Sequence, residues 1–162
     1  MPDQRLSALL AAALLLGLGQ PAPASANGTQ PAAAEASHGR YYGGVDWRTA
    51  KHVTVEMMEW GYRPRELRLT LGQPYRLTLI NYGSYNHYFN AAEFLRTVDA
   101  RKAVVERHAE IRAPYFTAFE VFRRGGTVDV YFIPKQAGTF AVHCHLADHR
   151  ERGVHGTIVV KE

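Results

Sequence analysis

The chain has 162 residues, of which 46% are hydrophobic and 21% are charged. This length and composition suit one compact globular domain and exclude a disordered polymer. The formal net charge of +4 is mild and the Lys and Arg residues are scattered, so we expect no nucleic-acid partner. The single cysteine, Cys144, excludes an intrachain disulfide framework, a four-cysteine zinc site and a two-cysteine copper centre.

The first 26 residues are typical of a signal peptide. Arg5 precedes an apolar run over 6–19, and Ala24-Ser25-Ala26 has the small-x-small pattern that signal peptidase reads. The apolar run is shorter than the roughly 20 residues that a membrane-spanning helix needs. We therefore expect export to the periplasm and no membrane span after cleavage, with an uncleaved anchor as the alternative. Residues 27–47 predict a flexible N-terminal arm, and residues 48–162 the folded domain.

From residue 52 onward, apolar and polar residues alternate with a period of two, which predicts half-buried strands separated by Pro and Gly turns. The predicted strands cover 53–57, 67–70, 75–79, 119–121, 127–133, 139–145 and 156–161. Short strands at this spacing predict an all-β fold, an antiparallel Greek-key β-sandwich. The segment between the predicted strands 75–79 and 119–121 contains helix formers between its apolar residues, so we expect a helical insertion around residues 90–116.

Four of the eight histidines fall in the stretch AVHCHLADHRERGVHG. Alternate side chains on a strand share a face, so Cys144 is expected to face the core while His143 and His145 point the other way. His149 follows five positions after the cysteine, in a loop that can turn its imidazole back toward the sulfur. One thiolate and two imidazoles in a trigonal arrangement are the donors of a blue-copper site.

A second imidazole must come from elsewhere in the sheet. His87 is the candidate, because it follows a predicted strand in the segment INYGSYNHYFN, where Gly83 and Ser84 permit a turn toward the end of the sandwich. The plain alternatives are a surface histidine for His87 and a small buried hydrophobic residue for Cys144.

Two stretches resemble the cupredoxins, the plastocyanin and azurin superfamily. The stretch VTVEMMEWGYRPRELRLTLGQPYRLTLINYGSYNHYF is similar to the early strands of that family, which end in an N-x-G-x-x-x-H-x-F copper loop. The stretch GTFAVHCHLADHRERGVHGTIVV resembles the closing loop that carries the cysteine and the second histidine. The resemblance covers about residues 52–162 and implies a cupredoxin-like domain with copper bound by His87, Cys144 and His149.

The axial position departs from the family pattern. The family usually has methionine ten residues after the cysteine, where this chain has Val154, which offers no donor atom. A weak axial ligand tunes the reduction potential rather than holding the metal, so we expect a three-coordinate copper site of raised potential. The alternative is a fourth ligand from His155, if the loop shifts by one residue.

The stretch from His143 to His149 also resembles the H-C-H-x-x-x-H motif of multicopper oxidases, in which the flanking histidines reach a trinuclear copper cluster. The chain has no other H-x-H pair and is short for the usual two or three domains, so we expect that it is not an enzyme. We expect His143 and His145 at the surface near the copper, with a second metal site or an interface as alternatives.

The expected function is therefore that of a periplasmic one-electron carrier, which uses Cu(I) and Cu(II) and passes electrons past an exposed edge of His149 to a redox partner protein. The alternative is a periplasmic copper-handling protein that delivers the ion to a client, which the surplus histidines and the missing axial methionine favour. We do not favour a metal-free interaction domain, because such a domain would gain nothing from placing a thiol and two imidazoles together. A catalytic cysteine lacks an evident oxyanion donor or orienting third group.

Overall fold

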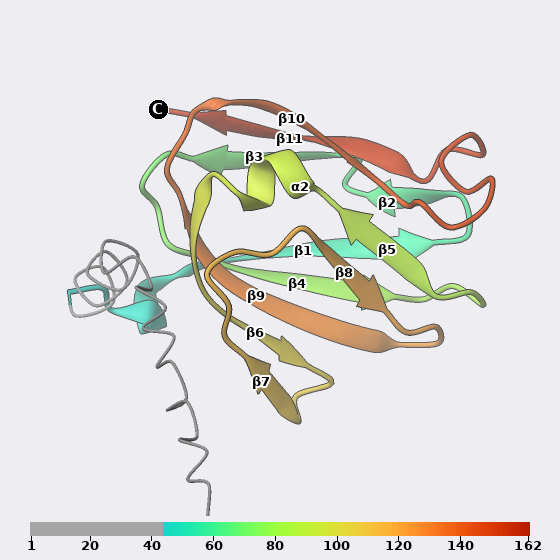
Figure 1. Cartoon of the computed structure of the whole chain (residues 1–162), viewed down its shortest axis with the longest axis horizontal. Coiled ribbons are helices and arrows are strands. Elements are labelled where there is room, and N and C mark those ends of the chain that lie inside the picture. The colour runs from blue at the N-terminus through green and yellow to red at the C-terminus, as the bar shows by residue number, and fades with distance from the viewer. Residues whose placement is uncertain (1–43) are drawn as a thin grey trace, which may run out of the picture. The chain divides into compact units, whose positions relative to one another are not determined.

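The computed structural model describes residues 44–162, so the predicted signal peptide and most of the predicted arm lie outside the described residues. Two β-sheets form the described part (Figure 1), and none of its helices is long and apolar enough to cross a membrane. The elements in chain order are η1 (Trp47–Thr49), β1 (Lys51–Met58), β2 (Gly61–Arg63), β3 (Glu66–Thr70), β4 (Tyr75–Asn81), β5 (His87–Asn90), α2 (Ala92–Leu95), β6 (Val98–Val105), β7 (Ala109–Ile111), β8 (Ala118–Val121), β9 (Gly126–Pro134), β10 (Gly138–His143) and β11 (His155–Lys161).

The strands are ordered β2-β1-β4-β9-β6-β7 in one sheet and β3-β11-β10-β5-β8 in the other. The chain leaves the first sheet after β2, adds β3 to the second sheet and returns as β4, so β1 and β4 run parallel. The strands β3 and β11 are also parallel, and the remaining pairs are antiparallel. The all-β prediction is confirmed, and the sheets are mixed rather than purely antiparallel.

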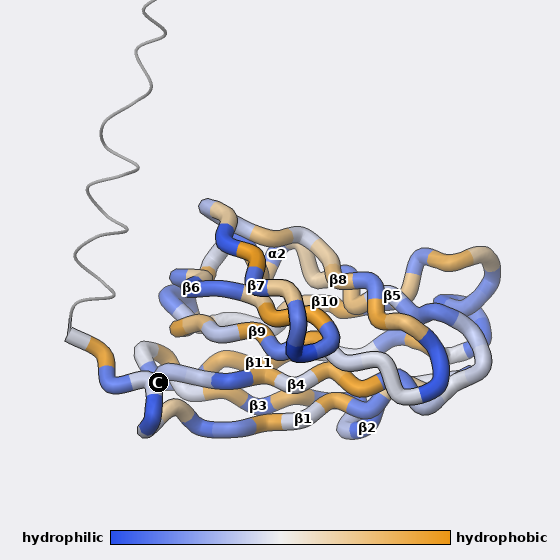
Figure 2. Tube along the Cα trace, turned by 90° about the horizontal axis from the view of Figure 1, so that it is seen from below, coloured by the Kyte–Doolittle hydropathy of each residue, from blue (hydrophilic) through white to orange (hydrophobic). Residues whose placement is uncertain are grey.

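The core lies between the inner faces of the two sheets. In β4 the residues Tyr75, Leu77 and Leu79 are buried in one hydrophobic cluster, while Arg76 between them pairs with Asp129 at the outer face. The strands β3, β10 and β11 show a similar alternation of buried and more exposed residues, and Figure 2 shows hydrophobic and hydrophilic residues mixed along the strands. The period of two in the sequence thus reports burial on one face, as expected for sheets that share a core.

The predicted helical insertion around 90–116 is mostly wrong. Only Ala92–Leu95 is helical, and the segment continues as the strands β6 and β7. The cause lies in β6, where a bulge between Ala100 and Lys102 shifts the pairing with β9 by one residue. A bulge inserts an extra residue and moves the side chains that follow to the opposite phase, so the alternation that marks a strand is interrupted.

Four connections gather at one end of the sandwich, on the right in Figure 1: β1–β2, β4–β5, β8–β9 and β10–β11. Asn81 ties two of them together from a fully buried position. Its side-chain amide donates to the carbonyl oxygens of Tyr85 (2.8 Å) and Val121 (2.9 Å), and its carbonyl oxygen accepts from the Gly83 N–H (2.9 Å). This network fixes the path of the chain into His87, the first residue of β5.

Replacing Asn81 by Ala is expected to lower the free energy of unfolding by about 3 kcal/mol, because the buried Val121 carbonyl, the partly buried Tyr85 carbonyl and the Gly83 N–H lose their partner. Urea denaturation followed by circular dichroism measures the change. The matched control is Asn86→Ala, since the side chain of Asn86 bonds to Glu120 and to the Arg123 N–H at the exposed surface. The control should lose less than about 1 kcal/mol, and equal losses in the two variants would contradict the assigned role of Asn81.

Candidate metal centre

Three potential ligands meet at the loop end of the second sheet. His87 opens β5, Cys144 directly follows β10, and His149 lies in the β10–β11 connection. The strands β5 and β10 are neighbours, with Asn90 opposite His143. This pairing brings the side chain of His87, at the start of β5, next to that of Cys144, which follows β10. His87 and Cys144 are completely buried, and His149 is 5% exposed.

The donor atoms converge closely enough for one ion. The Nδ1 atoms of His87 and His149 are 3.3 Å apart, and Nδ1 of His149 is 3.8 Å from the Cys144 sulfur. All three ligand atoms lie within 4.8 Å of one another. Bond lengths of about 2.0 Å to nitrogen and about 2.3 Å to sulfur allow donors of one ion to be up to about 4.3 Å apart. Both measured distances fall below this bound.

The electrostatics of the group favour a bound cation. Burial lowers the pKa of His87 below its ordinary value, the nearby His149 imidazole lowers it further, and the Glu59 carboxylate acts in the opposite direction. The neutral imidazole, which is the metal-binding form, is therefore favoured. Two neutral imidazoles that face each other through Nδ1 cannot both donate a proton along one short contact. A metal ion satisfies both nitrogen lone pairs and the sulfur at once.

Backbone groups surround the sulfur and the loop behind it. The Tyr88 N–H donates to the Cys144 sulfur at 3.4 Å. The Cys144 N–H donates to the Val154 carbonyl and the Val154 N–H donates to the His149 carbonyl, each at 2.9 Å. Hydrogen bonds to the sulfur tune the reduction potential of a bound metal.

The two positions considered for a fourth ligand differ in placement. Val154 is fully buried beside the group and carries no donor atom. His155 is exposed, and its Nε2 atom lies 3.3 Å from the Arg65 guanidinium. Within the described residues, the group that could hold a metal ion consists of His87, Cys144 and His149, and His155 is not part of it.

His143 and His145 lie on the opposite face from Cys144, as the strand alternation predicts. The exposed His145 ring packs against the Tyr88 ring with a centroid distance of 4.1 Å, and its Nδ1 is 3.3 Å from the Asn90 amide nitrogen. His143 is partly buried, and burial lowers its pKa. Neither belongs to a group of three metal-binding side chains in the part of the chain that the structure describes.

Two aromatic rings cover the outer edge of His149, which we expected to be exposed. Trp60 and Tyr85 meet its ring edge-on, with centroid distances of 5.6 and 5.8 Å, and are themselves 47% and 54% exposed. The Arg152 guanidinium lies 4.1 Å over the Trp60 ring and pairs with Asp148. No sequence pattern predicted that Trp60 and Tyr85 would contact His149, since both lie in turns outside the segments with a period of two.

The chain resembles known copper proteins in sequence and in structure. Residues 97–162 match a family model described as multicopper oxidase, a range that contains Cys144 and His149 but not His87. The McoA multicopper oxidase from Aquifex aeolicus matches with a TM-score of 0.57 at 11% identity, over 73% of this chain and 31% of that chain. Copper nitrite reductase from Nitrosomonas europaea matches with a TM-score of 0.54 at 10% identity, over 69% of this chain and 49% of that chain.

Auracyanin from Roseiflexus castenholzii gives a TM-score of 0.49 at 15% identity, over 70% of this chain and 99% of that chain. This chain spans 31% of the length of the oxidase chain and 49% of the length of the nitrite reductase chain. None of the curated proteins matches it. At such low identity the structural likeness shows the fold alone. The described part of the chain therefore has a cupredoxin-like fold, and its buried His87, Cys144 and His149 form a candidate metal site with the donor types of a copper centre.

Proposed function

We propose that this chain binds one copper ion through His87, Cys144 and His149 and acts as a one-electron carrier in the periplasm. The observation that carries the proposal is the convergence of these three buried donors. A thiolate and two imidazoles suit both Cu(I) and Cu(II), and bound copper supplies a one-electron exchange between these states. The location rests on the signal-peptide pattern of residues 1–26.

The surrounding residues would hold the donors in place and exclude water. His87 and Cys144 stand on neighbouring strands, and the hydrogen bonds of Val154 close the loop that carries His149. The Tyr88 N–H would stabilise negative charge on the sulfur. Trp60 and Tyr85 separate His149 from solvent, so a redox partner that docks at this end would touch these rings rather than the imidazole.

Burial of the donors favours electron transfer over copper delivery. A protein that hands copper to a client needs a ligand that an incoming donor can displace, whereas here all three ligands are at most 5% exposed. We further propose that the chain by itself is not an oxidase, because the sequence has no second H-x-H pair. The proposed partner is a redox protein.

Adding Cu(II) to the purified protein is expected to produce an intense blue thiolate-to-copper absorption band and narrow hyperfine splitting in paramagnetic resonance. The variant Cys144→Ser should lose both signals, since it removes the sulfur. The control His145→Ala should keep them, because this neighbouring imidazole packs on Tyr88 outside the donor group. Blue colour that survives in Cys144→Ser would refute the site.

Replacing Val154 by Met is expected to lower the reduction potential of the copper-loaded protein. A thioether near the metal would stabilise Cu(II) more than Cu(I), and the potential falls by roughly 60 mV for each tenfold preference. Cyclic voltammetry measures the shift. Val154→Leu changes the side chain without adding a donor and should stay near the parent value, so an equal shift in both variants would argue against an axial effect.

Removing the aromatic cover is expected to speed the loss of copper to a chelator. Each edge-on ring contact contributes about 0.5–1.5 kcal/mol, so Trp60→Ala and Tyr85→Ala should each raise the release rate about two- to tenfold. Phe122→Ala is the control, because Phe122 is also 52% exposed at this end but is not among the rings that contact His149. Rapid release from the parent protein itself would favour copper delivery over electron transfer.

A further inference from the structure

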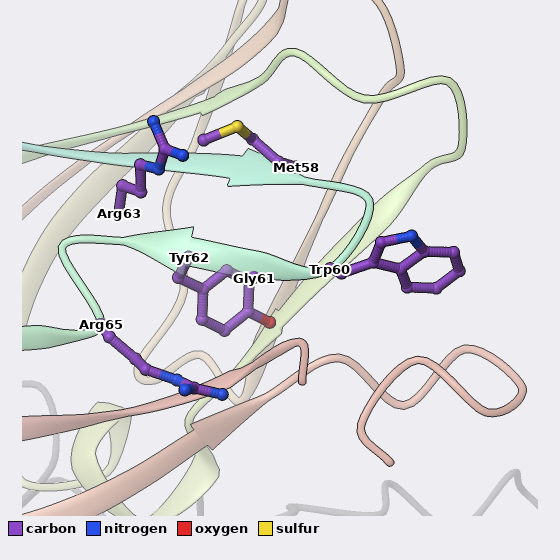
Figure 3. A pocket seen from close by; sticks show the side chains of 6 residues that line it. All are labelled: Met58, Trp60, Gly61, Tyr62, Arg63 and Arg65. Atoms are coloured by element: carbon purple, nitrogen blue, oxygen red, sulfur yellow. The ribbon is translucent and has the colours of Figure 1, made fainter. Parts of the chain in front are cut away.

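A groove opens beside the metal centre along the edge strand β2. Its volume is about 340 Å³, and its lining residues are Met58, Trp60, Gly61, Tyr62, Arg63 and Arg65. Figure 3 shows Trp60 at the turn of the β1–β2 hairpin, with Arg63 and Arg65 on opposite sides of β2. Trp60 is therefore shared, since it forms one wall of this β2 groove and also packs edge-on against His149.

The β2 groove carries positive charge that the domain does not neutralise. Two guanidinium groups line it and no carboxylate does. Arg65 donates only to the carbonyl oxygens of Gly153 and His155 and contacts the His155 ring. Arg63 stands opposite Glu56 in the β1–β2 pairing, yet the ion pairs of the described residues do not include this pair.

Some of the other arginines in the described residues are neutralised by nearby carboxylates. Five of them form ion pairs with carboxylates: Arg48, Arg68, Arg76, Arg112 and Arg152. Arg63 and Arg65 are not among these five, so their charges, like those of the other arginines without an ion pair, are available to a partner. A guanidinium that is free of internal ion pairs can bind a carboxylate through two parallel hydrogen bonds.

We propose that the β2 groove docks carboxylate side chains of an acidic redox protein, which places the partner against Trp60. This inference rests on the proposed electron-carrier function. Trp and Arg are the residue types that most often dominate the binding energy of an interface. Complementary charge also speeds and orients the encounter. The two arginines select the partner by charge, and the shared tryptophan brings it to the cover of the copper site.

The test uses the two tryptophans of the chain as reporters. Trp60 follows β1 and lines the groove, whereas Trp47 precedes β1 at its other end and packs against Tyr131. Titration of the isotope-labelled, metal-free protein with a hexaglutamate peptide should shift the indole N–H resonance of Trp60 and leave that of Trp47 in place. Equal shifts of both indoles, or no shift of Trp60, would overturn the proposal.

The double variant Arg63→Gln, Arg65→Gln should weaken peptide binding about ten- to a hundredfold if each exposed contact contributes up to about 1–1.4 kcal/mol. Arg112→Gln is the control, since Arg112 pairs with Glu110 of β7, the strand at the opposite edge of the same sheet. Unchanged affinity in the double variant would overturn the assignment of the groove. Tighter binding of an oligonucleotide of matching charge would overturn the choice of an acidic protein.

A second measurement separates this inference from the proposed function. The copper-loaded protein should exchange electrons faster with a small acidic haem protein than with a basic one, and the double variant should remove the difference. Peptide binding with no copper band would overturn the electron-carrier function and leave the anion groove in place. A copper band with no peptide binding would overturn the groove alone.

Discussion

The gathering of three electron-rich atoms in a dry interior is the constraint on which this domain depends. His87 and His149 are 62 positions apart in the chain, yet their Nδ1 atoms face each other at 3.3 Å. Without a cation, this contact holds at most one hydrogen bond, in which one Nδ1 donates and the other accepts, and burial keeps water from adding others. Two backbone features hold this arrangement in place. The pairing of β5 with β10 positions His87 and Cys144, and the backbone hydrogen bonds of Val154 position the loop that carries His149. A metal ion bound here would engage all three donor atoms at once.

The same end of the sandwich is rigid for reasons that do not involve the metal. The Arg124 and Gly125 N–H groups donate to the carbonyl oxygens of Gly83 and Asn81, which joins the β8–β9 turn to the β4–β5 connection. The buried Asn81 side chain adds three more bonds to this junction. Because the loops are tied to the strands and to one another, the ligands are held before the metal arrives. In the proposed electron carrier, such preorganisation would limit the rearrangement that accompanies a change of oxidation state.

The sequence allowed prediction of those features that leave a local pattern. Regular alternation identified β4 and the orientation of Cys144, and the spacing to His149 indicated a loop that returns to the sulfur. The bulge in β6 broke the alternation and led to the wrong prediction of a helix. The cover of His149 could not be predicted, because Trp60 meets that ring across a long separation in the chain and such contacts have no local signature.

The burial of His149 changes which side chains the proposed redox partner would have to contact. An exposed imidazole edge would let any apolar surface approach the metal, whereas here an approaching protein meets Trp60 and Tyr85 first. Both rings are about half exposed, so they can pack against a partner and the ligand at the same time. Arg63 and Arg65 lie on the Trp60 side of this cover and make the approach asymmetric in charge. Copper retention and partner choice would then depend on the same indole ring, with its inner edge against the imidazole and its outer face toward the docking protein.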